Sequence, residues 1–172
     1  MPNSLEQFAK SVHVTPQELF FILLREGAIG AVVLIVIAFL LSRFAGDIIG
    51  RSLLVIFLFL AAGAYFGFAI VGREVVGASP IWMLIELVQV IVFGTMGLLG
   101  LRGSPWWLAA GWALHPFWDY VVHYLGPGHP FAPFAYAIAC ITFDWVVAAY
   151  IVIAYGLRLV GQRTPARGAE AA

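Results

Sequence analysis

The chain has 172 residues, of which 63% are hydrophobic and 10% are charged, and its formal net charge is zero. Soluble domains carry about 25% charged residues, so this composition, with a mean hydropathy of +0.98, excludes an ordinary soluble domain and indicates a helical membrane protein. The neutral charge gives no basic face for nucleic acid, and the single cysteine, Cys140, excludes an internal disulfide and a cysteine-rich zinc site.

The first fifteen residues are expected to form either an amphipathic segment at the membrane interface or a frayed terminus. Leu5, Phe8 and Val12 make an apolar stripe on a short helix, which suits the boundary between headgroups and acyl chains. No signal-peptide pattern stands at the N-terminus. We therefore expect the first spanning helix to direct insertion.

Five apolar segments follow, and each is predicted to cross the membrane. The first begins at Thr15 and Pro16, where Thr15 is the expected N-cap and Glu18 completes a capping box. The predicted spans cover residues 16–42, 52–72, 80–101, 105–124 and 133–159. The fold class is therefore an all-α, polytopic membrane helix bundle of about five transmembrane helices. The bundle takes up residues 16–160, between the interfacial segment 1–15 and a C-terminal tail, 161–172, that is expected to be disordered.

Two glycine patterns predict where helices approach one another closely. Gly63 and Gly67 form a Gly-x-x-x-Gly motif in the second span, and Gly94, Gly97 and Gly100 recur every three residues in the third. Small residues allow backbones of neighbouring helices to approach. Both patterns are therefore expected to seat a neighbouring helix.

Basic residues predict the orientation, because cytoplasmic loops are enriched in Lys and Arg. With five spans, one side has Arg43, Arg51, Arg102, Arg158, Arg163 and Arg167, and the other has Lys10, Arg25 and Arg73. The protein is therefore predicted to be a multi-pass protein of the cell membrane, with its N-terminus outside and its C-terminus in the cytoplasm.

A stripe of polar residues interrupts the fourth span. His115, Asp119 and His123 are spaced four residues apart, so on an α-helix they spread over roughly 80° and about 12 Å of rise. Ionisable groups within a membrane are costly and usually face the bundle interior or a wet cavity. The stripe is therefore expected to point inward.

Polar residues on two other spans are predicted at overlapping depths. Glu86 lies six residues into the third span, about 9 Å from its outer end, and Gln89 lies one turn deeper. Asp144 lies eleven residues past Pro133, near the depth of His115. Since three separate segments bring carboxylates or imidazoles to similar levels, we expect one shared site in the outer half of the bundle.

Imidazoles and carboxylates together suit Zn²⁺ or another divalent metal. The predicted metal ligands are His115, Asp119, His123 and Asp144. The fourth span alone supplies three of them only if Pro116 distorts the helix; otherwise two residues of this span join Asp144 or Glu86. Glu86 and Asp144 are the candidate catalytic carboxylates, because a carboxylate that does not bind the metal can serve as a general base.

Three functions remain open from the residues alone. The first is a metal-binding membrane protein, including a membrane hydrolase that acts on a lipid-like substrate. The second is a small oligomeric transporter or proton-coupled carrier, and the third is a structural subunit whose buried polar groups only join helices. The expected partners are the lipid bilayer, a lipid-like or small-molecule ligand and further copies in a homo-oligomer, with no nucleic acid. The chain has neither a Gly-x-Ser-x-Gly motif nor a phosphate-binding loop.

The segment from His115 to His123, HPFWDYVVH, together with Phe143-Asp144, resembles a small uncharacterised family of bacterial integral-membrane proteins with a His, then Trp-Asp, then a second His. The resemblance covers the last two spans and implies a membrane protein with no assigned activity. More distantly, the intramembrane His and Asp residues resemble those of ceramidase-type membrane hydrolases. Those enzymes have seven spans and a separate His-x-x-x-His pair, whereas this chain has five predicted spans and no such pair.

Overall fold

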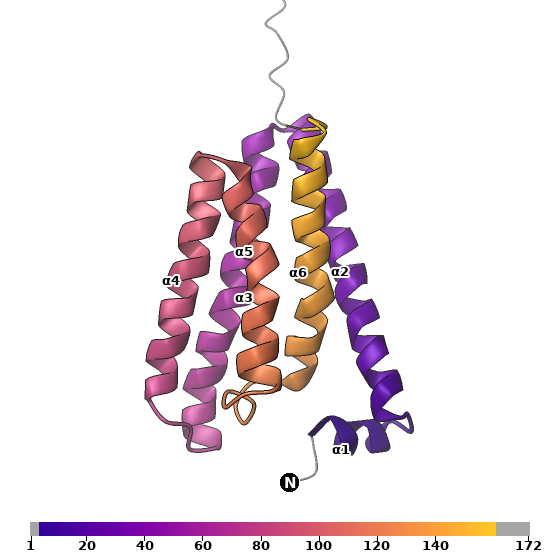
Figure 1. Cartoon of the computed structure of the whole chain (residues 1–172), viewed down its shortest axis with the longest axis vertical. Helices are drawn as coiled ribbons and strands as arrows, with labels where there is room; N and C mark the ends of the chain where they lie inside the picture. Colours follow the sequence, from indigo (N-terminus) through magenta and orange to yellow (C-terminus); the bar gives the residue numbers. More distant parts are fainter. Residues whose placement is uncertain (1–3, 161–172) are drawn as a thin grey trace, which may run out of the picture.

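The fold is known from a computed structural model that describes residues 4–160. Every element of this part is helical: α1 (Ser4–Ser11), α2 (Pro16–Phe44), α3 (Asp47–Val75), α4 (Ile81–Arg102), α5 (Pro105–Trp118), the π-helix η1 (Asp119–Tyr124) and α6 (Phe134–Gly156). The five longer helices run side by side along the long axis of the molecule, and α1 lies across the end where α2 begins (Figure 1). The expected tail, 161–172, lies outside the described residues.

Four helices, α2, α3, α4 and α6, are long and apolar enough to cross a membrane. The predicted span 105–124 is instead divided between α5, which has 14 residues, and the six-residue η1. The all-α bundle of apolar helices is thus confirmed, whereas the predicted count of about five spans is reached only when α5 and η1 are taken together.

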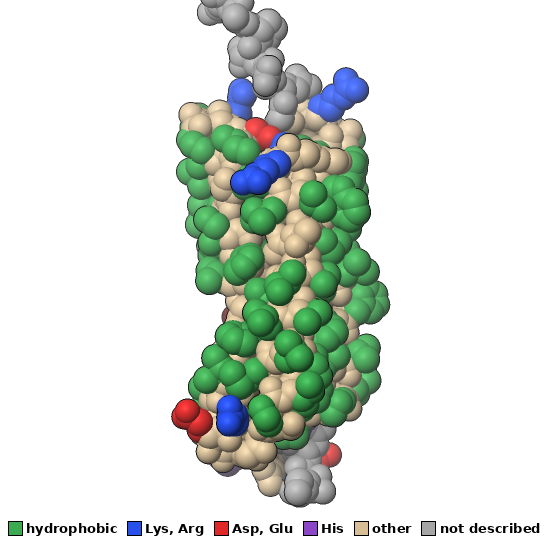
Figure 2. Space-filling view, turned by 90° about the vertical axis from the view of Figure 1, so that its left-hand side faces the viewer, with side chains coloured by type: hydrophobic (Ala, Val, Ile, Leu, Met, Phe, Trp, Pro, Cys, Tyr) green, Lys and Arg blue, Asp and Glu red, His purple; other side chains and the backbone are tan. Residues whose placement is uncertain are grey.

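The outer surface of the bundle is apolar along most of its length. Figure 2 shows one face on which hydrophobic side chains cover the middle and charged side chains gather at the two ends. Val33, Ile56 and Ile91 are among the large apolar side chains that are more than half exposed. Contiguous apolar surface of this extent is unfavourable in water and matches the acyl-chain region of a bilayer.

The predicted start of the first span is confirmed in atomic detail. The Thr15 hydroxyl oxygen accepts a hydrogen bond from the Glu18 backbone N–H at 3.2 Å, and the Glu18 carboxylate accepts one from the Thr15 N–H at 2.8 Å. This reciprocal capping satisfies two N–H groups that the first helical turn leaves free. On α1, Leu5 and Ala9 are buried in a small core with Leu19 of α2, so α1 packs against the bundle.

The first turn is shorter than predicted, because α3 already begins at Asp47. Arg51 pairs with Asp47 one helical turn away, and the Asp47 carboxylate also accepts a hydrogen bond from the Tyr155 hydroxyl at 2.7 Å. Arg51 further donates to the Gly100 carbonyl oxygen at 3.2 Å. These bonds satisfy the charges within the helix and fasten α3 to the ends of α4 and α6.

The two glycine predictions have opposite outcomes. In α4 the prediction is confirmed: a Cβ at Gly94 would lie 2.5 Å from the Phe59 ring, and one at Gly100 would lie 2.4 Å from the Leu108 Cβ. For Gly63 and Gly67 it is wrong, because no atom lies within 4 Å of a Cβ built at either position. The Gly-x-x-x-Gly motif therefore seats no helix within the described part of this chain.

The glycine contacts predict a difference between two matched substitutions. Gly100→Ala forces a methyl group against Leu108 and is expected to lower the free energy of unfolding by about 1–3 kcal/mol through overpacking. Gly67→Ala meets open space and gains helix propensity, so it is expected to leave stability unchanged or raise it. Thermal unfolding of the two variants in detergent, followed by circular dichroism, compares them, and equal melting temperatures would contradict the packing.

Candidate metal centre

The helix that carries most of the polar residues changes its winding where they occur. Ser104 is the N-cap of α5, and Pro105 occupies its first turn. Pro116 has no N–H for the carbonyl group one turn earlier, and three residues later the chain continues as the π-helix η1. The Leu125 N–H donates to the Tyr120 carbonyl oxygen at 2.9 Å, five residues back. The distortion expected from Pro116 is thus present, in a form that often marks functional sites.

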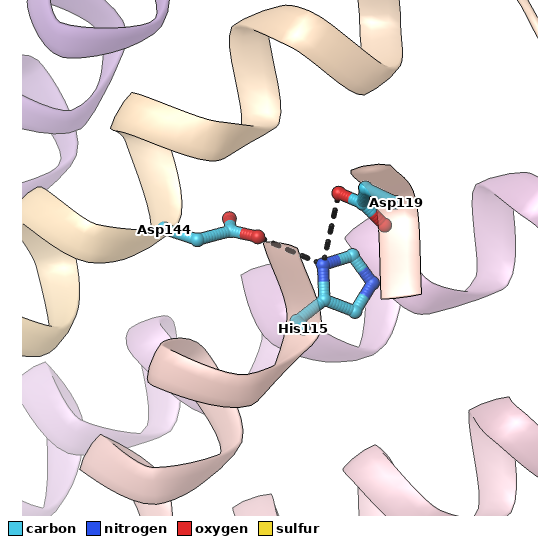
Figure 3. A group of neighbouring side chains, drawn as sticks. All are labelled: His115, Asp119 and Asp144. Carbon is cyan, nitrogen blue, oxygen red and sulfur yellow. Dashed lines mark hydrogen bonds and ion pairs between the residues drawn. The ribbon is translucent and has the colours of Figure 1, made fainter. Parts of the chain in front are cut away.

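Three of the predicted residues meet within the bundle. His115 near the end of α5, Asp119 at the start of η1 and Asp144 in the middle of α6 are all completely buried. One potential ligand atom from each lies within 4.8 Å of the other two. Figure 3 shows the two carboxylates approaching the His115 ring from different sides.

Both carboxylates face the same imidazole nitrogen. His115 Nδ1 lies 2.8 Å from Asp144 Oδ2 and 3.3 Å from Asp119 Oδ2 (Figure 3). Only the contact with Asp144 is a hydrogen bond. Both oxygens of Asp119 and Oδ1 of Asp144 have no hydrogen-bond partner in the described part of the chain. Buried acceptors without donors are costly, so these three oxygens have room for a further donor or a cation.

The spacing of these atoms is suited to a metal ion. Ligand atoms about 2.0–2.2 Å from a tetrahedral zinc lie about 3.3–3.6 Å from one another. The distance of 3.3 Å from His115 Nδ1 to Asp119 Oδ2 falls in this range, and the distance of 2.8 Å to Asp144 Oδ2 is shorter.

The second nitrogen of His115 contacts an amide. His115 Nε2 lies 3.5 Å from Gln89 Nε2, and the ring stands edge-on to Phe93 at 4.9 Å between centroids. Gln89 Oε1 has no hydrogen-bond partner among the described residues. Rotating the amide by 180° would present this oxygen to Nε2. The Gln89 amide can therefore donate a hydrogen bond to the imidazole, or its oxygen can accept one from Nε2–H when Nδ1 binds a metal.

Glu86 and His123 lie together in a second polar pair, outside the three-residue group. Glu86 Oε1 lies 3.4 Å from His123 Nε2, and Glu86 Oε2 accepts a hydrogen bond from the Trp118 indole N–H at 3.3 Å. Both residues are completely buried. Neither ring nitrogen of His123 has hydrogen-bond geometry to any described partner.

Aromatic and backbone contacts hold the His123 ring in place. Tyr65 of α3 stacks on it with centroids 3.9 Å apart and planes 8° from parallel. A Cβ at Gly128 would lie 2.4 Å from His123 Nδ1, so the loop after η1 requires glycine at this point. Nothing in the sequence singles out Tyr65 or Trp118 as a neighbour of the polar residues. Only the structure reveals these two partners.

The charge balance of the two polar groups is strongly negative. Three carboxylates, of Glu86, Asp119 and Asp144, are completely buried with the imidazoles of His115 and His123. No Lys or Arg is buried within residues 5–160. Even with both imidazoles protonated, one negative charge remains. Since an unpaired charge in a low-dielectric interior costs several kcal/mol, the interior must acquire protons or a cation.

This balance predicts how the metal-free protein responds to Asp119→Asn. The substitution keeps the size of the side chain and removes a buried charge with no hydrogen-bond partner, so it is expected to raise the free energy of unfolding by about 1–3 kcal/mol. Asp47→Asn is the matched control and is expected to lower it, because Asp47 is paired with Arg51 and Tyr155. Melting temperatures in detergent with chelator measure both, and a destabilised Asp119→Asn would contradict the prediction.

Comparison with known proteins identifies a family. A family model described as "Family of unknown function (DUF6010)" matches residues 26–156, a range that contains every candidate site residue. No curated protein and no solved structure matches the chain. The match covers roughly three quarters of the sequence. The chain therefore belongs to this family of unknown function.

Proposed function

We propose that the protein binds a divalent metal ion inside the membrane through His115, Asp119 and Asp144. One observation supports this most: two completely buried carboxylates face a single imidazole nitrogen, and three of their four oxygens have no hydrogen-bond partner among the described residues. A cation at their centre would satisfy all three side chains at once. One nitrogen and two oxygen ligands suit Zn²⁺, Fe²⁺ or Mn²⁺.

The number of protein ligands at this centre favours a catalytic metal over a purely structural one. Structural zinc sites use four protein ligands, whereas catalytic sites use three and leave a position for water. A metal held by His115, Asp119 and Asp144 would activate such a water for hydrolysis. Asp144 then serves as a ligand, and Glu86, on the same face of α4 as Gln89, is the remaining candidate for a general base. We therefore propose a membrane hydrolase as the enzymatic form of this function.

The proposed topology has five crossings, with α5 and η1 together forming the fourth. The polypeptide from Pro105 to Tyr124 has 20 residues, which is the length that a spanning helix needs. The end of the bundle with Arg43, Arg51, Arg102 and Arg158 has four basic residues, and the end with Lys10, Arg25 and Arg73 has three. By the positive-inside rule, the metal centre would lie in the outer half of a cell-membrane protein, with the N-terminus outside.

A proton-coupled carrier is the second candidate, because the Glu86–His123 pair has the features of a proton-binding group. Both nitrogens of His123 and one oxygen of Glu86 are buried without hydrogen-bond partners in the described region. Buried His and Glu residues of this kind form proton relays in transporters. This alternative places protons, rather than a metal, on the buried carboxylates, and further copies of the chain would be needed to enclose a pathway.

Metal content of the full-length protein, purified in mild detergent without chelator, tests the proposal. We expect about one equivalent of a divalent metal by elemental mass spectrometry. Asp119→Asn and Asp144→Asn keep the side-chain size but weaken one ligand each, so each is expected to lower the metal content at least fivefold. His123→Phe is the control, because it keeps a ring against Tyr65 and changes no residue of the proposed centre.

The possible results separate the candidate functions. Metal retained in His123→Phe and lost in the two Asp variants supports the centre. Absence of metal in the wild-type protein, both as purified and after dialysis against Zn²⁺, Fe²⁺ or Mn²⁺, contradicts it. In that case, proton flux into proteoliposomes that is abolished by Glu86→Gln would support the carrier.

A further inference from the structure

A lateral cavity of about 410 Å³ lies between α2, α3 and α6. Its walls include Phe57 and Leu60 of α3 and Phe143 of α6, and Glu26 lies at its rim on α2. Leu60 is 61% exposed, so the cavity opens on the side of the bundle. None of the residues that hold the proposed metal lines it.

The cavity follows from the way α2 packs. Gly27 approaches α6 so closely that a Cβ there would lie 2.0 Å from the Ala139 carbonyl oxygen, and the Thr142 hydroxyl donates to the Leu24 carbonyl oxygen at 2.5 Å. At its other end α2 is held to α3, where Gly50 packs against the Ala38 carbonyl oxygen. Figure 1 shows α2 and α3 diverging from their shared turn. The space between α2 and α3 therefore results from the way the packing contacts hold α2.

The lining and the position of this space point to a hydrocarbon chain. Apart from Glu26, the wall is apolar or aromatic, and all three helices are long and apolar enough to span a membrane. An apolar cavity of about 150 Å³ accommodates benzene. The lateral cavity is more than twice as large, which leaves room for a substantial part of an acyl chain.

Glu26, which lines the cavity, pairs with its neighbour Arg25. Arg25 and Glu26 form an ion pair of 2.7 Å, and their side chains are 67% and 53% exposed. The distance from Glu26 to Arg43 along α2 is about 26 Å, close to the thickness of the hydrocarbon core. The pair thus stands at the level of lipid headgroups. A phosphate with a neighbouring amine complements this arrangement, because the phosphate suits Arg25 and the amine suits Glu26.

We propose that the lateral cavity binds one zwitterionic glycerophospholipid, with an acyl chain between α2 and α3 and the headgroup on Arg25 and Glu26. The Tyr136 and Cys140 side chains of α6 form part of the cavity wall. The Tyr136 hydroxyl donates to the Ala61 carbonyl oxygen at 3.2 Å, which fixes this wall against α3. Because none of the proposed metal ligands lines the cavity, lipid binding does not require the metal.

Photo-crosslinking of the full-length protein tests this site. The protein is reconstituted in phosphatidylglycerol nanodiscs with about one per cent of phosphatidylethanolamine that has a diazirine in the middle of one acyl chain, and the labelled peptides are mapped. We expect the label to concentrate on residues 57–61 and 136–143, and unlabelled phosphatidylethanolamine to reduce it. The same diazirine on phosphatidylglycerol is expected to give at least fivefold less label there.

A matched pair of variants makes the test specific. Ala61→Phe fills the cavity and is expected to reduce the label at least fivefold, whereas Ala64→Phe, on the same helix but outside the cavity lining, keeps it. Leu60→Trp, compared with Leu84→Trp on α4, provides a second pair if Ala61→Phe does not fold. Label spread evenly over all helices, or wild-type label in folded Ala61→Phe or Leu60→Trp, would overturn the proposal. Metal content is measured on the same samples and is expected to stay unchanged.

Discussion

Burial of negative charge is the constraint on which the rest of this structure depends. Glu86, Asp119 and Asp144 are completely enclosed by helices whose outer surface is apolar, and their companions are two imidazoles. A bilayer offers no water to solvate these groups. The bundle can hold these carboxylates only if their negative charge is neutralised by the imidazoles, by protons or by a cation. Replacing buried ionic groups with apolar residues is often stabilising, so stability alone does not account for their presence.

The remaining contacts hold the helices that present these groups. At one end, Asp47, Arg51 and Tyr155 join α3 to α6, and Arg51 also donates to the last turns of α4. Along the bundle, Gly94 and Gly100 bring α4 close to α3 and α5. The π-helix η1 then places Asp119 and His123 in different polar groups. Rigid packing around a local distortion is a common way to position polar residues within a membrane.

Much of the fold could be predicted because apolar runs of about twenty residues have few alternatives to a spanning helix. The starts of α2 at Thr15–Pro16 and of α5 at Ser104–Pro105 could be predicted because capping residues act locally. The prediction for Gly63 and Gly67 is wrong, because a small residue permits close approach of a helix but does not show whether a neighbouring helix is present. The turn near Asp47 was placed wrongly since the ion pair that keeps it helical depends on Tyr155, more than a hundred residues away.

The site was predicted in outline, because helix periodicity fixes depth and face. His115, Asp119 and Asp144 do come together, but the winding of η1, which puts His123 with Glu86, has no sequence signature beyond Pro116.

X-ray absorption spectroscopy of the zinc-loaded protein is the most direct test of the proposed metal centre. We expect the zinc to have one nitrogen and two or three oxygen ligands at about 2.0–2.2 Å, and the spectrum to be altered in Asp144→Asn. A spectrum of hydrated zinc, unchanged by that substitution, would contradict it.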